Sequence, residues 1–163
     1  LLAMMVPFAA TLIPLFKLFT GLGLQSTWIA YILPTISTPF LIMLFRQSTR
    51  TFPREIIEAA RIDGLSEFKI FAQLYFPTMK STYAAAMTVT FMNAWNNYLW
   101  PKVIMMSADS QTMPMMVANL SAGYSIDYGV LMVGVLICSL PTGILFLILQ
   151  RSFTNGILGA VKG

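Results

Sequence analysis

The side chains that could act as general acids or bases lie close together in one internal stretch. Paired carboxylates can transfer protons in catalysis. A spacing of three to five residues within a charged stretch is more simply the solvated face of a helix. We therefore predict that this chain has no catalytic residue. Four of the six acidic residues lie in that stretch, between Arg46 and Lys80: Glu55, Glu58, Asp63 and Glu67.

The remaining residue types restrict metal and cofactor chemistry as well. The chain contains no histidine and one cysteine, Cys138, which lies in an apolar run where a small buried residue is expected. Catalysis by histidine, metal sites built from His or paired Cys, and an intramolecular disulfide are excluded. The chain also lacks the phosphate-binding pattern G-x-x-x-x-G-K-[ST]. We predict no metal and no bound cofactor, and the chain cannot hydrolyse ATP alone.

A second polar group consists of Asn93, Asn96 and Asn97. At spacings of three and four residues they are expected to share one helix face, with Trp100 close by. One interpretation is structural, because amides within a membrane need hydrogen-bond partners on neighbouring helices. The other is a polar lining for a hydrophilic solute, with aromatic rings for stacking on sugar faces. The residues leave both interpretations open.

Composition places most of the chain in lipid. The sequence is 57% hydrophobic and 10% charged, with a mean hydropathy of +0.74, whereas soluble domains carry about 25% charged residues. The net charge of +4 is modest and belongs to the loops, so nucleic acid is a poor candidate partner. We predict an all-α membrane protein, a bundle of about four transmembrane helices over residues 2–19, 28–45, 81–100 and 129–149.

The segments between these spans define a topology. Basic residues follow the second span at Arg46 and the last span at Arg151, and cytoplasmic loops carry an excess of Lys and Arg. We predict a single transmembrane domain, 1–163, with a cytoplasmic loop at 46–80, an outside loop at 101–128 and a cytoplasmic tail at 150–163. Both ends of this fragment are then cytoplasmic.

The charged loop should fold as helix, turn and helix near the membrane surface. Pro53 and Glu55 suit a helix start, where proline fits the first turn and an acidic residue faces the positive helix end. Gly64 is expected to end that helix, because glycine takes the left-handed conformation at little cost. A second helix should follow Ser66 and end or bend at Pro77.

The same loop resembles the EAA motif of ABC importer permeases. Glu58-Ala59-Ala60 is followed by three residues, Gly64, nine residues, and Leu74-Tyr75-Phe76-Pro77, which matches the family spacing EAA, three, G, nine, I-x-L-P. Leu74 and Phe76 stand where Ile and Leu are usual, and both changes conserve apolar volume. Three residues alone would carry no weight, but the full spaced pattern between two membrane spans is specific.

The resemblance extends over essentially the whole chain, to the carbohydrate branch of this family and, more closely, its maltose-type G subunits. It is carried by Arg61-Ile62-Asp63-Gly64, by Trp95-Asn96, and by Gln150-Arg151 with Ala160-Val161-Lys162-Gly163. Such subunits usually have six spans. The chain also opens inside a hydrophobic run without an initiator methionine, so we expect it to be the C-terminal part of a longer protein.

The resemblance implies a transmembrane permease subunit of an ATP-driven importer for a sugar, oligosaccharide or related polyol. It would pair with a second permease subunit, two ATP-binding cassette subunits that bind ATP and Mg²⁺, and an extracytoplasmic solute-binding protein, in a bacterial or archaeal plasma membrane. The loop would dock into the ATPase and couple its closure to movement of the bundle. The coupling residues would be Glu58, Ala59, Ala60, Arg61, Asp63, Gly64 and Pro77, and Asn93, Asn96 and Asn97 would line the translocation pathway.

Two alternatives remain. A permease of the same class could carry glycerol phosphate or an amino acid, but an anionic cargo would favour a basic residue on the pathway. The one basic side chain near membrane depth is Lys17, which is placed to extend to the interface. A membrane scaffold or enzyme subunit with an incidental motif would have no ATPase partner and would tolerate substitution of Gly64.

Overall fold

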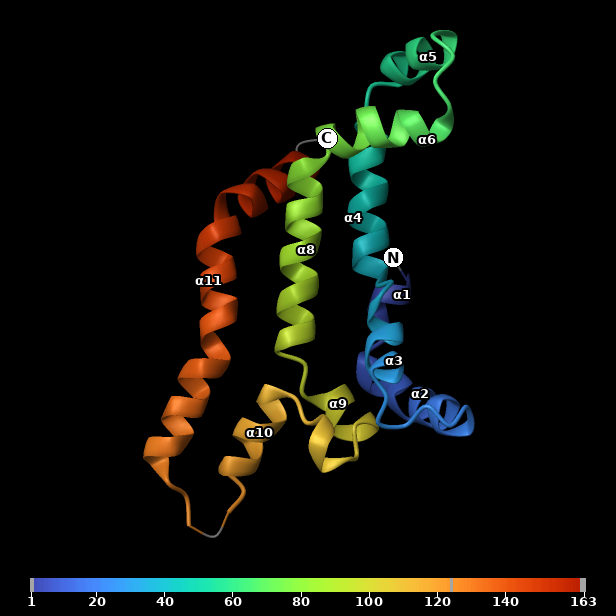
Figure 1. The fold of residues 1–163 in the computed structure, drawn as a ribbon. Coiled ribbons are helices and arrows are strands. Elements are labelled where there is room, and N and C mark those ends of the chain that lie inside the picture. Colours follow the sequence, from blue (N-terminus) through green and yellow to red (C-terminus); the bar gives the residue numbers. More distant parts are fainter. Residues whose placement is uncertain (1, 124, 162–163) are drawn as a thin grey trace.

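The computed structural model describes residues 2–123 and 125–161, with side chains described through Ile148, and every regular element in that part is helical (Figure 1). The predicted all-helical fold is therefore confirmed for the described residues. In chain order the elements are α1 Leu2–Met5, α2 Phe8–Gly21, α3 Trp28–Ile32, η1 Leu33–Thr35, α4 Pro39–Arg50, α5 Arg54–Ile62, α6 Glu67–Ile70, η2 Phe71–Tyr75, α7 Phe76–Thr78, α8 Lys80–Trp95, α9 Leu99–Ile104, η3 Ala108–Ser110, α10 Met113–Leu120 and α11 Tyr128–Val161.

Helices α4, α8 and α11 run side by side along the molecule, with α8 between the other two (Figure 1). The charged helices α5 and α6 lie beyond one end of them, while α2, α9 and α10 lie at the other end. Hydroxyl groups bond across the α4–α8 contact, where Ser48 Oγ and Thr82 Oγ1 are 3.0 Å apart. Thr82 is buried there, so the pair satisfies polar groups that lipid would leave without partners.

The first two predicted spans are broken where prolines fall. The span expected at residues 2–19 is interrupted between α1 and α2, because Pro7 caps α2 in an extended conformation and cannot donate a backbone hydrogen bond. The span expected at 28–45 consists of α3 and η1 followed by α4, with a bend of 43° between them. Pro39 begins α4 there, with Thr38 as its N-cap.

The third predicted span, 81–100, is shorter in the structure. Helix α8 ends at Trp95, and Trp100 belongs to the separate helix α9. Asn96 and Asn97 lie at this end, where asparagine competes with helical hydrogen bonding through its own amide. At 1.5 Å per residue, the 16 residues of α8 extend about 24 Å, less than the ~30 Å hydrocarbon core of a bilayer.

One helix in the described part is long and apolar enough to cross a membrane by itself, over Tyr128–Ile148 of α11. The bent pair Trp28–Thr35 and Pro39–Arg50 gives a second span if the two pieces are taken together. The four-span count is therefore not established by helix length and composition. Helix α11 also continues to Val161, past the predicted span end at Leu149, and the tail residues Lys162 and Gly163 lie outside the described residues.

Trp100 belongs to a buried apolar cluster at the end of the molecule away from the charged helices. Phe19, Ala30, Ile104 and Met105 surround it. Its indole Nε1 donates a hydrogen bond of 3.1 Å to the carbonyl of Ala30, and its ring meets that of Phe19 edge to face at 5.9 Å between centroids. This cluster fixes α2, α3 and α9 relative to one another and closes that end of the molecule.

Candidate functional site

The charged segment folds as two helices joined by a tight turn at Gly64. Helix α5 ends at Ile62, Gly64 has a φ of +79°, and α6 begins at Glu67. The backbone N–H of Leu65 bonds back to the carbonyl of Ala60 at 3.0 Å, as in a glycine-terminated helix end. We call residues 54–78, which comprise α5, the turn, α6, η2 and α7, the charged hairpin (Figure 1).

An ion pair closes the turn of the charged hairpin. The guanidinium Nε of Arg61 donates to Oε1 of Glu67 at 2.8 Å. The hydrogen bond and charge of Glu67 raise the pKa of Arg61 above its ordinary value, so Arg61 is charged at any physiological pH. Both side chains are well exposed, where such pairs contribute little stability. The pair therefore orients α5 and α6 more than it holds them together.

The residues of the EAA triplet do not all face outward. Glu58 is exposed and lines a cavity of about 280 Å³ between α5 and η2, together with Arg61 and Tyr75. Ala59 and Asp63 are exposed as well. Ala60, by contrast, is only 7% exposed.

Aromatic side chains tie the charged hairpin to the long helices, a role that the sequence analysis missed. The ring centroid of Phe52, just before α5, lies 4.5 Å from the ring centroid of Tyr75 in η2. The ring of Tyr83 in α8 lies 4.9 Å from that of Phe76 and 5.0 Å from that of Phe45 in α4. The signal was present in the sequence, since these five aromatics flank or fall within the EAA motif.

Pro77 marks the corner where the charged hairpin turns into α8. The preceding segment η2 has the wider π-helical winding, which is found mostly as single turns within helices and often at functional sites. Helix α7 ends at Thr78, Met79 departs from helical geometry with ψ of 21°, and α8 begins at Lys80. In Figure 1 the α6–α7 segment runs across the direction of α8.

The three asparagines separate into two groups. Asn93 and Asn97 line a cavity of about 80 Å³ together with Thr35 and Thr38 at the helix break before α4. Asn96 instead lines a different cavity, between α10 and α11. Asn96, which directly follows the last residue of α8, therefore does not share a cavity with Asn93 and Asn97, contrary to the prediction of one common face.

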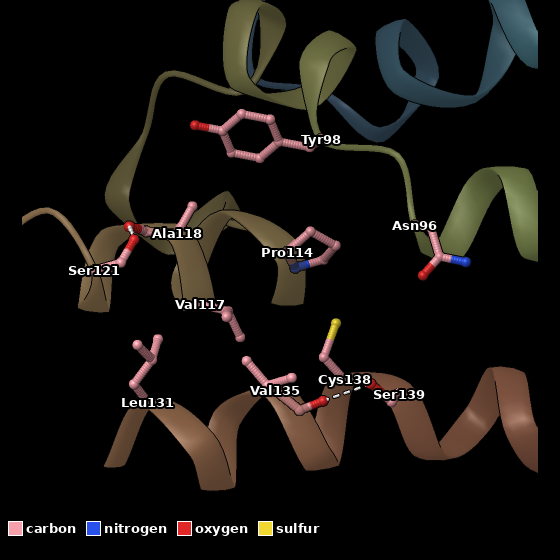
Figure 2. A pocket seen from close by; sticks show the side chains of 10 residues that line it. All are labelled: Asn96, Tyr98, Pro114, Val117, Ala118, Ser121, Leu131, Val135, Cys138 and Ser139. Atoms are coloured by element: carbon pink, nitrogen blue, oxygen red, sulfur yellow. Dashed lines mark hydrogen bonds between the residues drawn. The ribbon is translucent and has the colours of Figure 1, made fainter. Parts of the chain in front are cut away.

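The cavity at Asn96 has a volume of about 470 Å³ (Figure 2). Tyr98 lies on one side and the sulfur of Cys138 points into it from α11. Ser139 also lines it, but its hydroxyl is bonded to the carbonyl of Val135 at 2.7 Å. The other lining residues are Pro114, Val117, Ala118, Ser121, Leu131 and Val135. The cavity is therefore mainly apolar, and its polar groups are an amide, a phenol, a thiol and the hydroxyls of Ser121 and Ser139, both of which bond to backbone carbonyls.

Two side chains at the end of α8 bond to α11. The indole Nε1 of Trp95 donates to the backbone carbonyl of Cys138 at 2.8 Å. The amide of Asn96 donates to the Met92 carbonyl at 2.9 Å and approaches Thr142 Oγ1 at 3.5 Å, which is a weak contact. Pro141, which lies inside α11, falls between these two attachment points. Trp95 and Asn96 thus fix α8 on both sides of the proline.

Taken together, the described residues present an exposed charged hairpin at one end and a cavity with few polar groups near the other. The chain matches, over residues 1–158, the family of binding-protein-dependent transport system inner membrane components. It belongs to that family. The description places family members in the inner membrane, as components of transport systems that depend on a binding protein.

Curated relatives make the resemblance more specific. A lactose transport system permease protein of Rhizobium radiobacter is 48% identical over 99% of this chain. An arabinooligosaccharides transport system permease protein of Halalkalibacterium halodurans is 40% identical over 100% of the chain. An sn-glycerol-3-phosphate transport system permease protein of Escherichia coli (strain K12) is 30% identical over 99%. The chain spans 59%, 59% and 58% of these relatives.

Proposed function

We propose that this chain is part of a permease subunit of an ATP-driven importer for a neutral sugar or oligosaccharide. The observation that carries the proposal is the spaced EAA motif, which folds as an exposed hairpin whose turn requires Gly64 at a φ of +79°. The more similar relatives are permeases of lactose and arabinooligosaccharide transport systems, which supports a sugar as the solute.

The partners follow from the same proposal. The hairpin would lie on the cytoplasmic side and dock into one of two ATP-binding cassette subunits, which bind ATP and Mg²⁺ and perform the hydrolysis. A second permease subunit would complete the pathway, and an extracytoplasmic binding protein would deliver the solute. Glu58 and Asp63 supply exposed charges for docking. Closure of the ATPase pair would then move α4 and α8 through the aromatic contacts of the charged hairpin.

The Asn96 cavity is the better candidate for solute contact within this chain. Its volume of about 470 Å³ falls in the range of small-molecule sites. The cavity at Asn93 and Asn97 has about 80 Å³, which is room for two or three water molecules at ~30 Å³ each. The ring of Tyr98 and the amide of Asn96 suit a sugar, which has an apolar face and hydroxyl edges.

The test is reconstitution of the full-length permease with its ATPase, second permease and binding protein in vesicles. We expect lactose or an arabinooligosaccharide to stimulate ATP hydrolysis and uptake. Replacement of Glu58 by Ala should weaken the ATPase association, while Lys102→Gln at the opposite end serves as control. If glycerol 3-phosphate stimulates ATP hydrolysis and the sugars do not, the transported solute is anionic, as the name of the relative from E. coli suggests for that protein. Absence of any ATPase association would reject the importer proposal.

A further inference from the structure

The face of α4 that points away from α8 combines an apolar half with a cationic half. Leu44 of α4 is buried, and Phe45 and Ser48 contact α8. The opposite face lines a cavity of about 410 Å³, to which Ala3 of α1 contributes the far wall. The residues of α4 on this face follow a strict helical stripe, at spacings of three and four: Pro39, Ile42, Met43, Arg46, Gln47 and Arg50.

Along this stripe apolar residues are followed by cationic ones, as the acyl chains of a phospholipid are followed by its anionic head group. Ile42 and Met43 are 59% and 46% exposed, as suits side chains that contact lipid. Arg46 and Arg50 follow one and two turns later, at the end of α4 that leads into the charged hairpin. The stripe from Pro39 to Arg50 is about 17 Å long at 1.5 Å per residue, and its apolar part, Pro39 to Met43, accounts for about 6 Å, so it contacts an acyl chain only next to the head group.

The two arginines have no protein counter-charge. Among the side chains that the structure describes, the single ion pair joins Arg61 and Glu67, so neither Arg46 nor Arg50 pairs with a carboxylate there. Gln47 lies between them and adds an amide donor. Planar guanidinium groups bind phosphate oxygens through two parallel hydrogen bonds, and basic pockets beside membrane helices bind anionic head groups.

From this juxtaposition we propose that the α1–α4 cavity is a binding site for one anionic phospholipid. Arg46 and Arg50 hold the phosphate, Gln47 contacts the head group, and an acyl chain lies along Met43, Ile42 and Pro39. The inference depends on the proposed membrane position of α4, but not on which solute the complex transports. It therefore stands or falls separately from the sugar proposal.

The test is native mass spectrometry of the full-length permease complex, titrated with phosphatidylglycerol or phosphatidylcholine of equal chain length. We expect one phosphatidylglycerol to bind more tightly than the others and phosphatidylcholine to lack such a site. Each arginine should contribute about a fivefold change in affinity, so the double variant Arg46→Gln/Arg50→Gln should bind about 25-fold more weakly. The charge-matched control Lys69→Gln/Lys80→Gln, at the same end but outside the cavity, should bind within about twofold of wild type.

Further variants separate a lipid site from other occupants. Met43→Ser should weaken long-chain phosphatidylglycerol but leave the binding of inorganic phosphate unchanged, which distinguishes a lipid from a free anion. An equal loss of phosphatidylglycerol affinity in the arginine and lysine double variants would mean that general surface charge accounts for the binding, and would reject the site. Unchanged lipid binding with loss of the second permease from the arginine variant would assign the stripe to a protein contact and also reject it.

Discussion

A substitution at Gly64 tests the backbone conformation of the turn alone, because a new side chain there meets no neighbouring atom. A Cβ built on this glycine meets no heavy atom within 4 Å, yet its φ is +79°. Substitution therefore costs backbone strain and no clash, which for an L-residue in the left-handed region amounts to about 1–2 kcal/mol. The strain depends on residue type, because Asn tolerates this region and β-branched residues do not.

We therefore expect a graded loss of coupling at Gly64. Uptake per ATP hydrolysed, measured in vesicles, should fall little in Gly64→Asn, more in Gly64→Ala and most in Gly64→Val. Gly143 of α11, which also has open space around its Cβ position but no positive φ, supplies the control Gly143→Ala. Equal activity of the Asn and Val variants would show that the left-handed turn is not what couples the two processes.

Asn96 and Asn93 allow the two cavities to be compared directly. If the solute contacts the larger cavity, Asn96→Leu should raise the solute concentration for half-maximal uptake, because it removes the amide without removing volume. Asn93→Leu is the matched control, since it makes the same change beside the cavity of about 80 Å³ and should leave that concentration unaltered. The reverse pattern would move the solute contact to the Asn93 side of α8.

At the scale of elements, the link between α8 and α11 rests on the indole of Trp95. Trp95→Phe keeps the stacking on Phe91, whose ring lies 5.9 Å away and nearly parallel, but removes the donor to Cys138. We expect a stability loss of about 0.6 kcal/mol, the average for hydrogen bonds between membrane helices, seen as a lower unfolding temperature in detergent.

Trp28→Phe is the control for that loss. Trp28 is 59% exposed, and its indole has no hydrogen-bond partner among the described residues, so its replacement should not lower the unfolding temperature. A fall of equal size in both variants would mean that the indole rings act through their apolar area alone.

Element identity was largely predictable from the sequence, whereas element ends were not. Composition predicted an all-helical chain, and the positions of Pro53 and Gly64 predicted the bounds of α5 closely. These signals are local, since proline and glycine restrict or free their own backbone. The end of α8 at Trp95 was missed, because hydropathy alone does not reveal where a helix stops inside an apolar run.

Side-chain positions depended on tertiary packing and could be predicted least. Ala59 and Ala60 are chemically identical, yet Ala60 alone of the two is buried. Ala3 and Arg50 line the same cavity beside α1 and α4, although no local pattern connects them. The EAA motif was informative because its spacing already encodes such packing, through Tyr75 and Phe76 at its end.

For the whole molecule, the aromatic contacts beneath the charged hairpin have a mechanical consequence. Phe52, just after α4, packs against Tyr75 of the hairpin. Phe76 of the hairpin packs against Tyr83 of α8, and Tyr83 also packs against Phe45 of α4. A force applied to the hairpin is thus shared between both helices, which should tilt as one rigid plate without sliding past each other. The flexibility needed for a change of conformation should then lie at the edges of this pair of helices, at the 43° bend before α4 and along α11.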